Sequence, residues 1–127
     1  MNPDDRSYHP EHEWVKIGEG GLATIGITDF AQRQLGEIVY VELPEVGSTI
    51  SAGQVYGEVE SVKSVSELYA PVTGQVVQVN STLPDTPEII NSEPYGEGWI
   101  VKIQMSDPEE MESLMPADRY SVHVGEA

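Results

Sequence analysis

The chain has 127 residues, enough for one domain with its own core, and no run approaches the roughly 20 apolar residues that span a bilayer. It has no cysteine, which excludes disulfides and thiolate metal sites. Six basic residues against 22 acidic ones give a formal charge of −16, which argues against nucleic acid or an anionic membrane as partner. The first residues resemble neither a secretory signal nor a transit peptide, so we expect a cytoplasmic protein.

The first third of the chain predicts a β-hairpin followed by one short helix. Two runs of β-forming residues, 13–17 and 22–27, flank the glycine-rich turn 18–21. Thr28 is suited to a helix N-cap, and Gly36 lies where a glycine commonly ends a helix. We therefore expect a helix between these two residues.

From residue 37 onward the pattern is typical of many short strands. They are expected at 38–43, 54–60, 65–70, 75–80 and 99–105. Turn signals at intervals of roughly 8–12 residues indicate a sandwich or a barrel. Residues 81–98 suggest a loop with one helical turn near 88–91, and the acids after Pro108 favour a helix that ends near Pro116.

We expect residues 1–127 to form a single domain. A further turn at 117–120 leads into a polar tail. The end segments 1–7 and 121–127 are expected to be frayed, because terminal residues are poorly ordered unless something holds them.

Lys63 is the first candidate functional residue. The chain has three lysines, and two of them, Lys16 and Lys102, fall within strand patterns as solvent-facing positions. Lys63 instead lies in a short link between two strands, with Ser61 and Ser64 close on either side. An amine at a hairpin tip is hydrated, protonated and accessible to a modifying enzyme. Spacing alone nevertheless favours an ordinary turn lysine.

An ordered set of motifs resembles the H proteins of the glycine cleavage system. In chain order they include His12-Glu13-Trp14, Gly26-Ile27-Thr28-Asp29, Val41-Glu42-Leu43-Pro44, Glu60-Ser61-Val62-Lys63, Tyr69-Ala70-Pro71-Val72-Thr73-Gly74 and Pro94-Tyr95-Gly96. The resemblance covers residues 8–120. It implies a mainly β fold, the barrel-sandwich hybrid of lipoyl and biotinyl carriers, with a few short peripheral helices.

The resemblance also implies a function. Lys63 would carry lipoate as an amide, and the chain would be a monomeric carrier and not an enzyme. It would take the aminomethyl group of glycine from the decarboxylating P protein to the aminomethyltransferase (T protein), and present its reduced arm to dihydrolipoyl dehydrogenase (L protein). A lipoate-attaching enzyme would be a fourth partner. In this family the loaded arm folds into a cleft, with Glu13 and Glu67 as the expected acidic side chains near its amine.

Several alternatives remain open at this point. An H-protein-like carrier could relay lipoate to the lipoyl domains of other enzymes. A biotinyl carrier is disfavoured because Val62 and Ser64, and not methionines, flank the lysine. An unmodified acidic binding module or a small enzyme would leave the ordered motifs unexplained. His9 and His12 could hold a metal, but Pro10 interrupts them, so we interpret them as surface residues.

Overall fold

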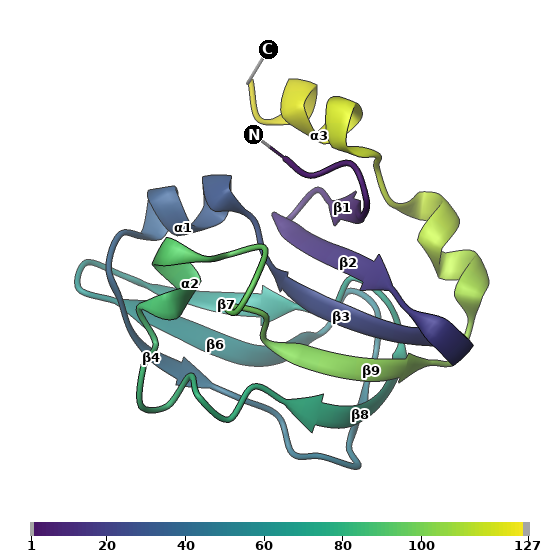
Figure 1. Ribbon diagram of the computed structural model, residues 1–127, viewed down its shortest axis with the longest axis horizontal. Coiled ribbons are helices and arrows are strands. Elements are labelled where there is room, and N and C mark those ends of the chain that lie inside the picture. Colours follow the sequence, from purple (N-terminus) through teal and green to yellow (C-terminus); the bar gives the residue numbers. More distant parts are fainter. Residues whose placement is uncertain (1, 126–127) are drawn as a thin grey trace.

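The computed structural model describes residues 2–125, and the strands in this range form two antiparallel sheets (Figure 1). The larger sheet contains, in spatial order, β1 (Ser7–His9), β2 (Glu13–Ile17), β3 (Leu22–Ile27), β9 (Val101–Met105), β8 (Gly74–Val79) and β5 (Thr49–Ile50). The smaller sheet contains β4 (Ile38–Glu42), β6 (Val55–Ser61) and β7 (Val65–Tyr69). The expected mainly β fold is confirmed, although the two described sheets do not join into a closed barrel.

The main core lies between the two sheets. Side chains alternate along each strand, so one face of each sheet is apolar and turned inward. Val15 and Ile25 from the larger sheet and Val59 from the smaller one are completely buried in this core. Burial of each such side chain contributes roughly 1.5–3 kcal/mol. This core fixes the relative position of β2 and β7, the strands that carry Glu13 and Glu67.

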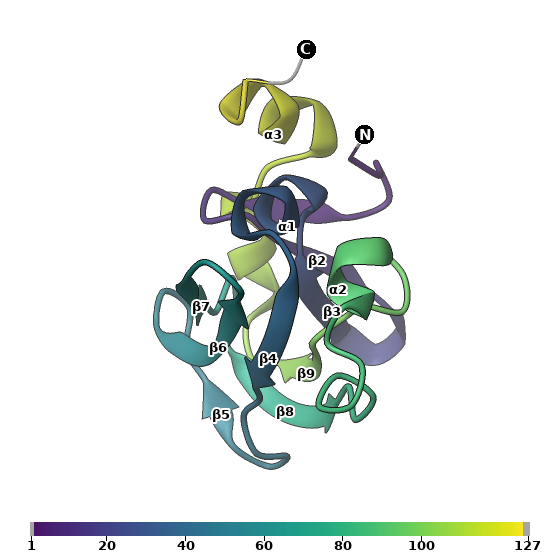
Figure 2. The same ribbon diagram turned by 90° about the vertical axis from the view of Figure 1, so that its left-hand side faces the viewer.

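Short helices lie at the edges of the sheets (Figures 1 and 2). They are α1 (Asp29–Leu35), α2 (Ile89–Ser92), α3 (Ala117–His123) and the 3₁₀ helices η1 (Glu19–Gly21) and η2 (Pro108–Ser113). Helix α1 begins as the sequence predicts, because the Thr28 hydroxyl accepts a hydrogen bond from the Ala31 N–H. It ends at Gly36, whose φ of +83° favours glycine.

Both ends of the chain are more structured than the sequence predicts. Ser7 belongs to β1, and residues 121–123 belong to α3, so the expected frayed tails are wrong at these positions. The rings of Tyr8 and Tyr120 are fully buried and stack with centroids 4.9 Å apart. With Trp14 they form a second apolar cluster, which holds the two ends together. Met1 and residues 126–127, which the same expectation covered, lie outside the described residues.

Candidate functional site

The link that contains Lys63 is a tight hairpin between β6 and β7. The last strand pair is Glu60 with Val65, and the Ser61 N–H donates to the Ser64 carbonyl at 2.8 Å. The Ser61 hydroxyl oxygen accepts from the backbone N–H groups of Lys63 and Ser64 at 3.3 and 3.1 Å. A small side chain with an acceptor oxygen therefore closes the turn and leaves the Lys63 side chain exposed.

The hairpin tip is anchored to the C-terminal end of α1. The Val62 N–H donates to the Glu37 carbonyl at 3.1 Å. A Cβ atom added to Gly36 would lie 3.4 Å from Lys63 Cε, so the aliphatic stem of this lysine lies against the glycine. The side chain thus leaves the hairpin along the end of α1.

Asn91 of α2 holds this end of α1 in place. Its Oδ1 accepts from the Ile38 N–H at 2.9 Å, and its Nδ2 donates to the Gly36 carbonyl at 2.8 Å. Nδ2 also donates to Gln32 Oε1 at 2.9 Å. One side chain therefore satisfies backbone groups at both the end of α1 and the start of β4, on either side of the lysine anchor.

Lys63 differs from the other two lysines in its surroundings. Lys16 forms an ion pair with Asp5 at 3.3 Å, and Lys102 Nζ lies 4.9 Å from the centroid of the Trp99 ring. In the part of the chain that the structure describes, the Lys63 ammonium has no ion pair, hydrogen bond or aromatic ring against it. Of the three, it is the lysine whose ammonium has no such contact within the described residues.

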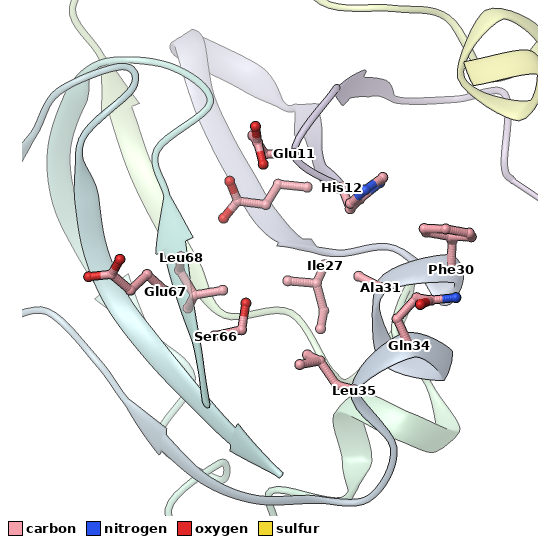
Figure 3. A pocket seen from close by; sticks show the side chains of 11 residues that line it. Glu11, His12, Ile27, Phe30, Ala31, Gln34, Leu35, Ser66, Glu67 and Leu68 are labelled. Carbon is pink, nitrogen blue, oxygen red and sulfur yellow. The ribbon is translucent and has the colours of Figure 1, made fainter. Parts of the chain in front are cut away.

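A cleft of about 290 Å³ lies between α1 and the edges of β2 and β7 (Figure 3). Its lining residues are Glu11, His12, Glu13, Ile27, Phe30, Ala31, Gln34, Leu35, Ser66, Glu67 and Leu68. Leu35 lines the cleft, and the next residue, Gly36, contacts the Lys63 stem. One wall of the cleft therefore ends one residue before the glycine that the Lys63 stem approaches, and the lining combines apolar and polar side chains.

Glu13 contributes a buried carboxyl group to the cleft. It is 2% exposed, and neither carboxyl oxygen has a hydrogen-bond partner within the described residues. Burial raises the pKa of Glu13 well above its usual value, while interaction with the Tyr56 hydroxyl partly lowers this pKa and nearby Glu11 raises it further. The Tyr56 hydroxyl is likewise buried without a hydrogen-bond partner, and a buried polar group without such a partner is costly.

Glu67 is placed differently from Glu13. Its side chain is exposed, accepts a 3.3 Å hydrogen bond from the Tyr69 hydroxyl, and in Figure 3 points away from Ile27 and His12. In the strand register Glu67 lies opposite Glu58, which in turn lies opposite Glu42. Glu67 therefore lines the same cleft as Glu13 and also belongs to a row of carboxylates along the smaller sheet.

His12 is a cleft residue that the sequence interpretation misses. We expected it on the surface, but it is partly buried and lines the cleft beside Phe30, with ring centroids 4.8 Å apart. Its Nδ1 lies 2.8 Å from the Tyr120 hydroxyl. His9 is engaged separately, since its Nδ1 accepts from the Glu11 N–H. The partner of His12 is too distant in the sequence for any local pattern to reveal it.

Within residues 2–125, no three metal-ligating side chains converge. None of the helices in that range has the length and apolar character that crossing a membrane requires.

A partner-free lysine at a hairpin tip beside an apolar cleft is the arrangement of a carrier, a class of protein that holds a reactive group on a tether. The chain belongs to the glycine cleavage H-protein family, whose model matches residues 6–127. Members of this family are lipoyl carriers within the glycine cleavage system.

Similarity to individual relatives extends along nearly the whole chain. The glycine cleavage system H proteins of Brevibacillus brevis and Staphylococcus epidermidis are 56% and 53% identical over 124 residues, which cover 98% of this chain and 98% of each relative. A crystal structure of the H protein from Mycobacterium marinum superposes with a TM-score of 0.91 at 43% identity, and covers 98% of this chain and 99% of that one.

Proposed function

We propose that this chain is a lipoylated carrier and that Lys63 is the residue to which lipoate is attached. The observation that carries the proposal is the contact between the Lys63 stem and Gly36, next to a cleft that begins at Leu35. Lys63 is also the lysine without a partner in the described structure, whereas Lys16 and Lys102 are engaged.

The cleft suits an arm of this kind. Ile27, Ala31 and Leu35 offer an apolar surface for a hydrocarbon chain, and Glu13 offers a buried carboxyl that lacks a partner. An ammonium brought to Glu13 would form a charge-assisted hydrogen bond and would relieve the cost of burying that carboxyl. The donor set therefore fits an apolar tether that ends in an amine.

The residues of the chain then have distinct tasks. The Ser61 turn presents the Lys63 amine, and Gly36 leaves room for its stem. The apolar walls exclude bulk water from the cargo, which protects labile bonds. Lipoate supplies the disulfide that accepts a one-carbon group and electrons, and this chemistry belongs to the cofactor.

Membership of the glycine cleavage H-protein family supports a role in a relay with other enzymes. We propose that it carries the aminomethyl group of glycine from the P protein to the T protein, and its reduced arm to the L protein, after a lipoate-attaching enzyme has modified it. A tether raises the effective concentration of the cargo at the active site of each partner. A carrier can therefore speed the overall reaction without catalysing any step itself. We propose that it acts as a monomer in the cytoplasm.

Intact-mass measurement after expression with lipoate and a lipoate ligase tests the proposal. Wild type should gain one lipoyl adduct, Lys63→Arg none, and the control variants Lys16→Arg and Lys102→Arg one each. An adduct that persists in Lys63→Arg, or an unmodified wild type, would refute the assignment. Glycine-dependent CO₂ release with P protein then separates the glycine cleavage role from a lipoate relay to other enzymes.

A further inference from the structure

The hydroxyl of Tyr120 links the C-terminal helix to two residues at the cleft. It lies 2.7 Å from Thr28 Oγ1 and 2.8 Å from His12 Nδ1. Thr28 is the N-cap of α1, the helix that forms one wall, and His12 lines the cleft itself. Tyr120 is fully buried and its ring is held by the stack on Tyr8. The Tyr120 hydroxyl of α3 therefore contacts both the N-cap residue of α1 and a residue of the cleft lining.

One arrangement of protons is compatible with the contacts that Thr28, Tyr120 and His12 make with one another. The Thr28 hydroxyl donates to Tyr120, the Tyr120 hydroxyl donates to His12 Nδ1, and Thr28 Oγ1 still accepts from the Ala31 N–H. It requires a neutral imidazole with its proton on Nε2. Burial lowers the pKa of His12, with His123 and His9 lowering it further and Glu11 raising it, so the neutral form predominates at pH 7.

His12 needs such support because its backbone is strained. Its φ is +74°, a left-handed conformation that costs a residue with a side chain on the order of 1–3 kcal/mol and persists only where the surroundings impose it. The His12 carbonyl accepts from the Thr28 N–H at 3.1 Å, so backbone and side chain both tie it to Thr28. The same conformation sets the imidazole against Phe30.

We propose that Tyr120 is a positioning residue for the cleft: through its hydroxyl, α3 fixes the wall formed by His12 and Phe30, against which the tethered arm rests. That the tethered arm rests against this wall depends on the function proposed above. That Tyr120 fixes the wall can be tested in the unmodified protein, so the two claims can fail separately.

The test compares Tyr120→Phe with Tyr8→Phe in the unmodified protein. Both variants keep their rings, but the Tyr8 hydroxyl donates to the Pro3 carbonyl and does not contact the cleft. We expect Tyr120→Phe to shift the ¹⁵N resonance of His12 Nδ1 and to speed amide exchange of Thr28 several-fold relative to Ile25 in the core. Tyr8→Phe should change neither of these. Unchanged His12 and Thr28 signals in Tyr120→Phe, or equal changes in both variants, would overturn the proposal.

The lipoylated proteins give the second readout. After loading from glycine and P protein, release of the one-carbon cargo to water should be several-fold faster in Tyr120→Phe than in wild type or Tyr8→Phe. Equal release rates would also overturn the proposal. If Tyr120→Phe does not fold, Thr28→Val removes the other hydroxyl of the chain and leaves the tyrosine stack intact. It should then give the same His12 shift, and an unchanged His12 signal would overturn the proposal. A wild type that takes up no lipoate counts against the carrier function only.

Discussion

The stem of Lys63 rests against Gly36, so the anchor of the arm and the end of α1 are in direct contact. A Cβ on Gly36 would lie 3.4 Å from Lys63 Cε and 3.8 Å from Cδ. Gly36 also has φ +83° and ψ −157°, a combination reserved almost entirely for glycine. This glycine therefore serves two purposes, because it ends the helix and leaves space for the lysine.

We predict that Gly36→Ala lowers the free energy of unfolding by roughly 1–3 kcal/mol, because alanine is strained at these backbone angles. It should also slow lipoylation of Lys63 several-fold, since the added methyl group comes into van der Waals contact with the lysine stem and restricts its movement. Urea denaturation measures the first effect, and the rate of adduct formation by mass spectrometry measures the second.

Gly53→Ala is the matched control for this variant. Gly53 has the same φ of +83°, but a Cβ there would meet nothing within 4 Å. It should lose a similar stability and retain the wild-type rate of lipoylation. If both alanine variants slow lipoylation equally, strain and not contact with the lysine is responsible.

We predict that the free energy of unfolding of wild type falls as the pH rises, and that Glu13→Gln abolishes this fall. Burial raises the pKa of Glu13 in the folded state, so above the unfolded value near 4.5 the folded state binds the extra proton. The free energy of unfolding then falls with increasing pH, by up to about 1.4 kcal/mol per unit, until the folded pKa is reached. Urea denaturation of both proteins between pH 5 and 8 gives this difference.

Net charge must be controlled in that comparison, because the chain already carries a formal charge of −16. Glu19 is exposed, so Glu19→Gln removes the same charge without touching the cleft. Its stability should run parallel to that of wild type across the pH range. If the free energies of unfolding of Glu13→Gln and wild type differ by a constant amount between pH 5 and 8, Glu13 is ionised in the folded protein across this range.

We predict that Asn91→Ala destabilises the protein by about 2–4 kcal/mol, because it leaves the Ile38 N–H and the Gly36 carbonyl without their partner. It should also slow lipoylation, since Gly36 is no longer held. Asn80→Ala is the comparison: Asn80 donates to the Glu97 and Trp99 carbonyls, away from Lys63. Its loss should reduce the melting temperature but leave the lipoylation rate intact, and equal slowing would contradict the prediction.

The features that the sequence predicts well are those with local causes. Helix α1 lies where its cap Thr28 and its terminal Gly36 place it, because both signals act within one turn of the helix ends. The hairpin around Lys63 follows for the same reason, since Ser61 closes the turn three residues from its partner.

The orientation of Glu67 could also have been predicted, and was not. Leu68 is buried in the core, and adjacent residues of a strand face opposite sides, so the Glu67 side chain must point outward. The motif resemblance predicts both glutamates at the cleft, and both line it, Glu13 as a buried side chain and Glu67 as an exposed one. Glu13 and Val15 are two residues apart on β2, so the same rule places the Glu13 side chain on the buried face of the sheet together with Val15.

Other features depend on partners that are distant in sequence. Strand β1 pairs with the neighbouring β2, but Tyr8 also forms a bridge with Met115 and stacks on Tyr120. Neither of these two neighbours can be inferred from residues 1–9. The place of His12 in the cleft has the same origin. From the sequence alone, the polar segments at the two ends of the chain are therefore expected to be disordered, and only the tertiary contacts show otherwise.

The stack of Tyr8 on Tyr120 has a consequence for how the protein folds. Contacts between residues so far apart in the sequence carry a large loop-closure cost and are expected to form late. The contact between His12 and Tyr120 spans a similar separation in the sequence, so the cleft wall at His12 is expected to form after the local hairpins. A cleft able to shield cargo would then be one of the last features of the fold to be completed.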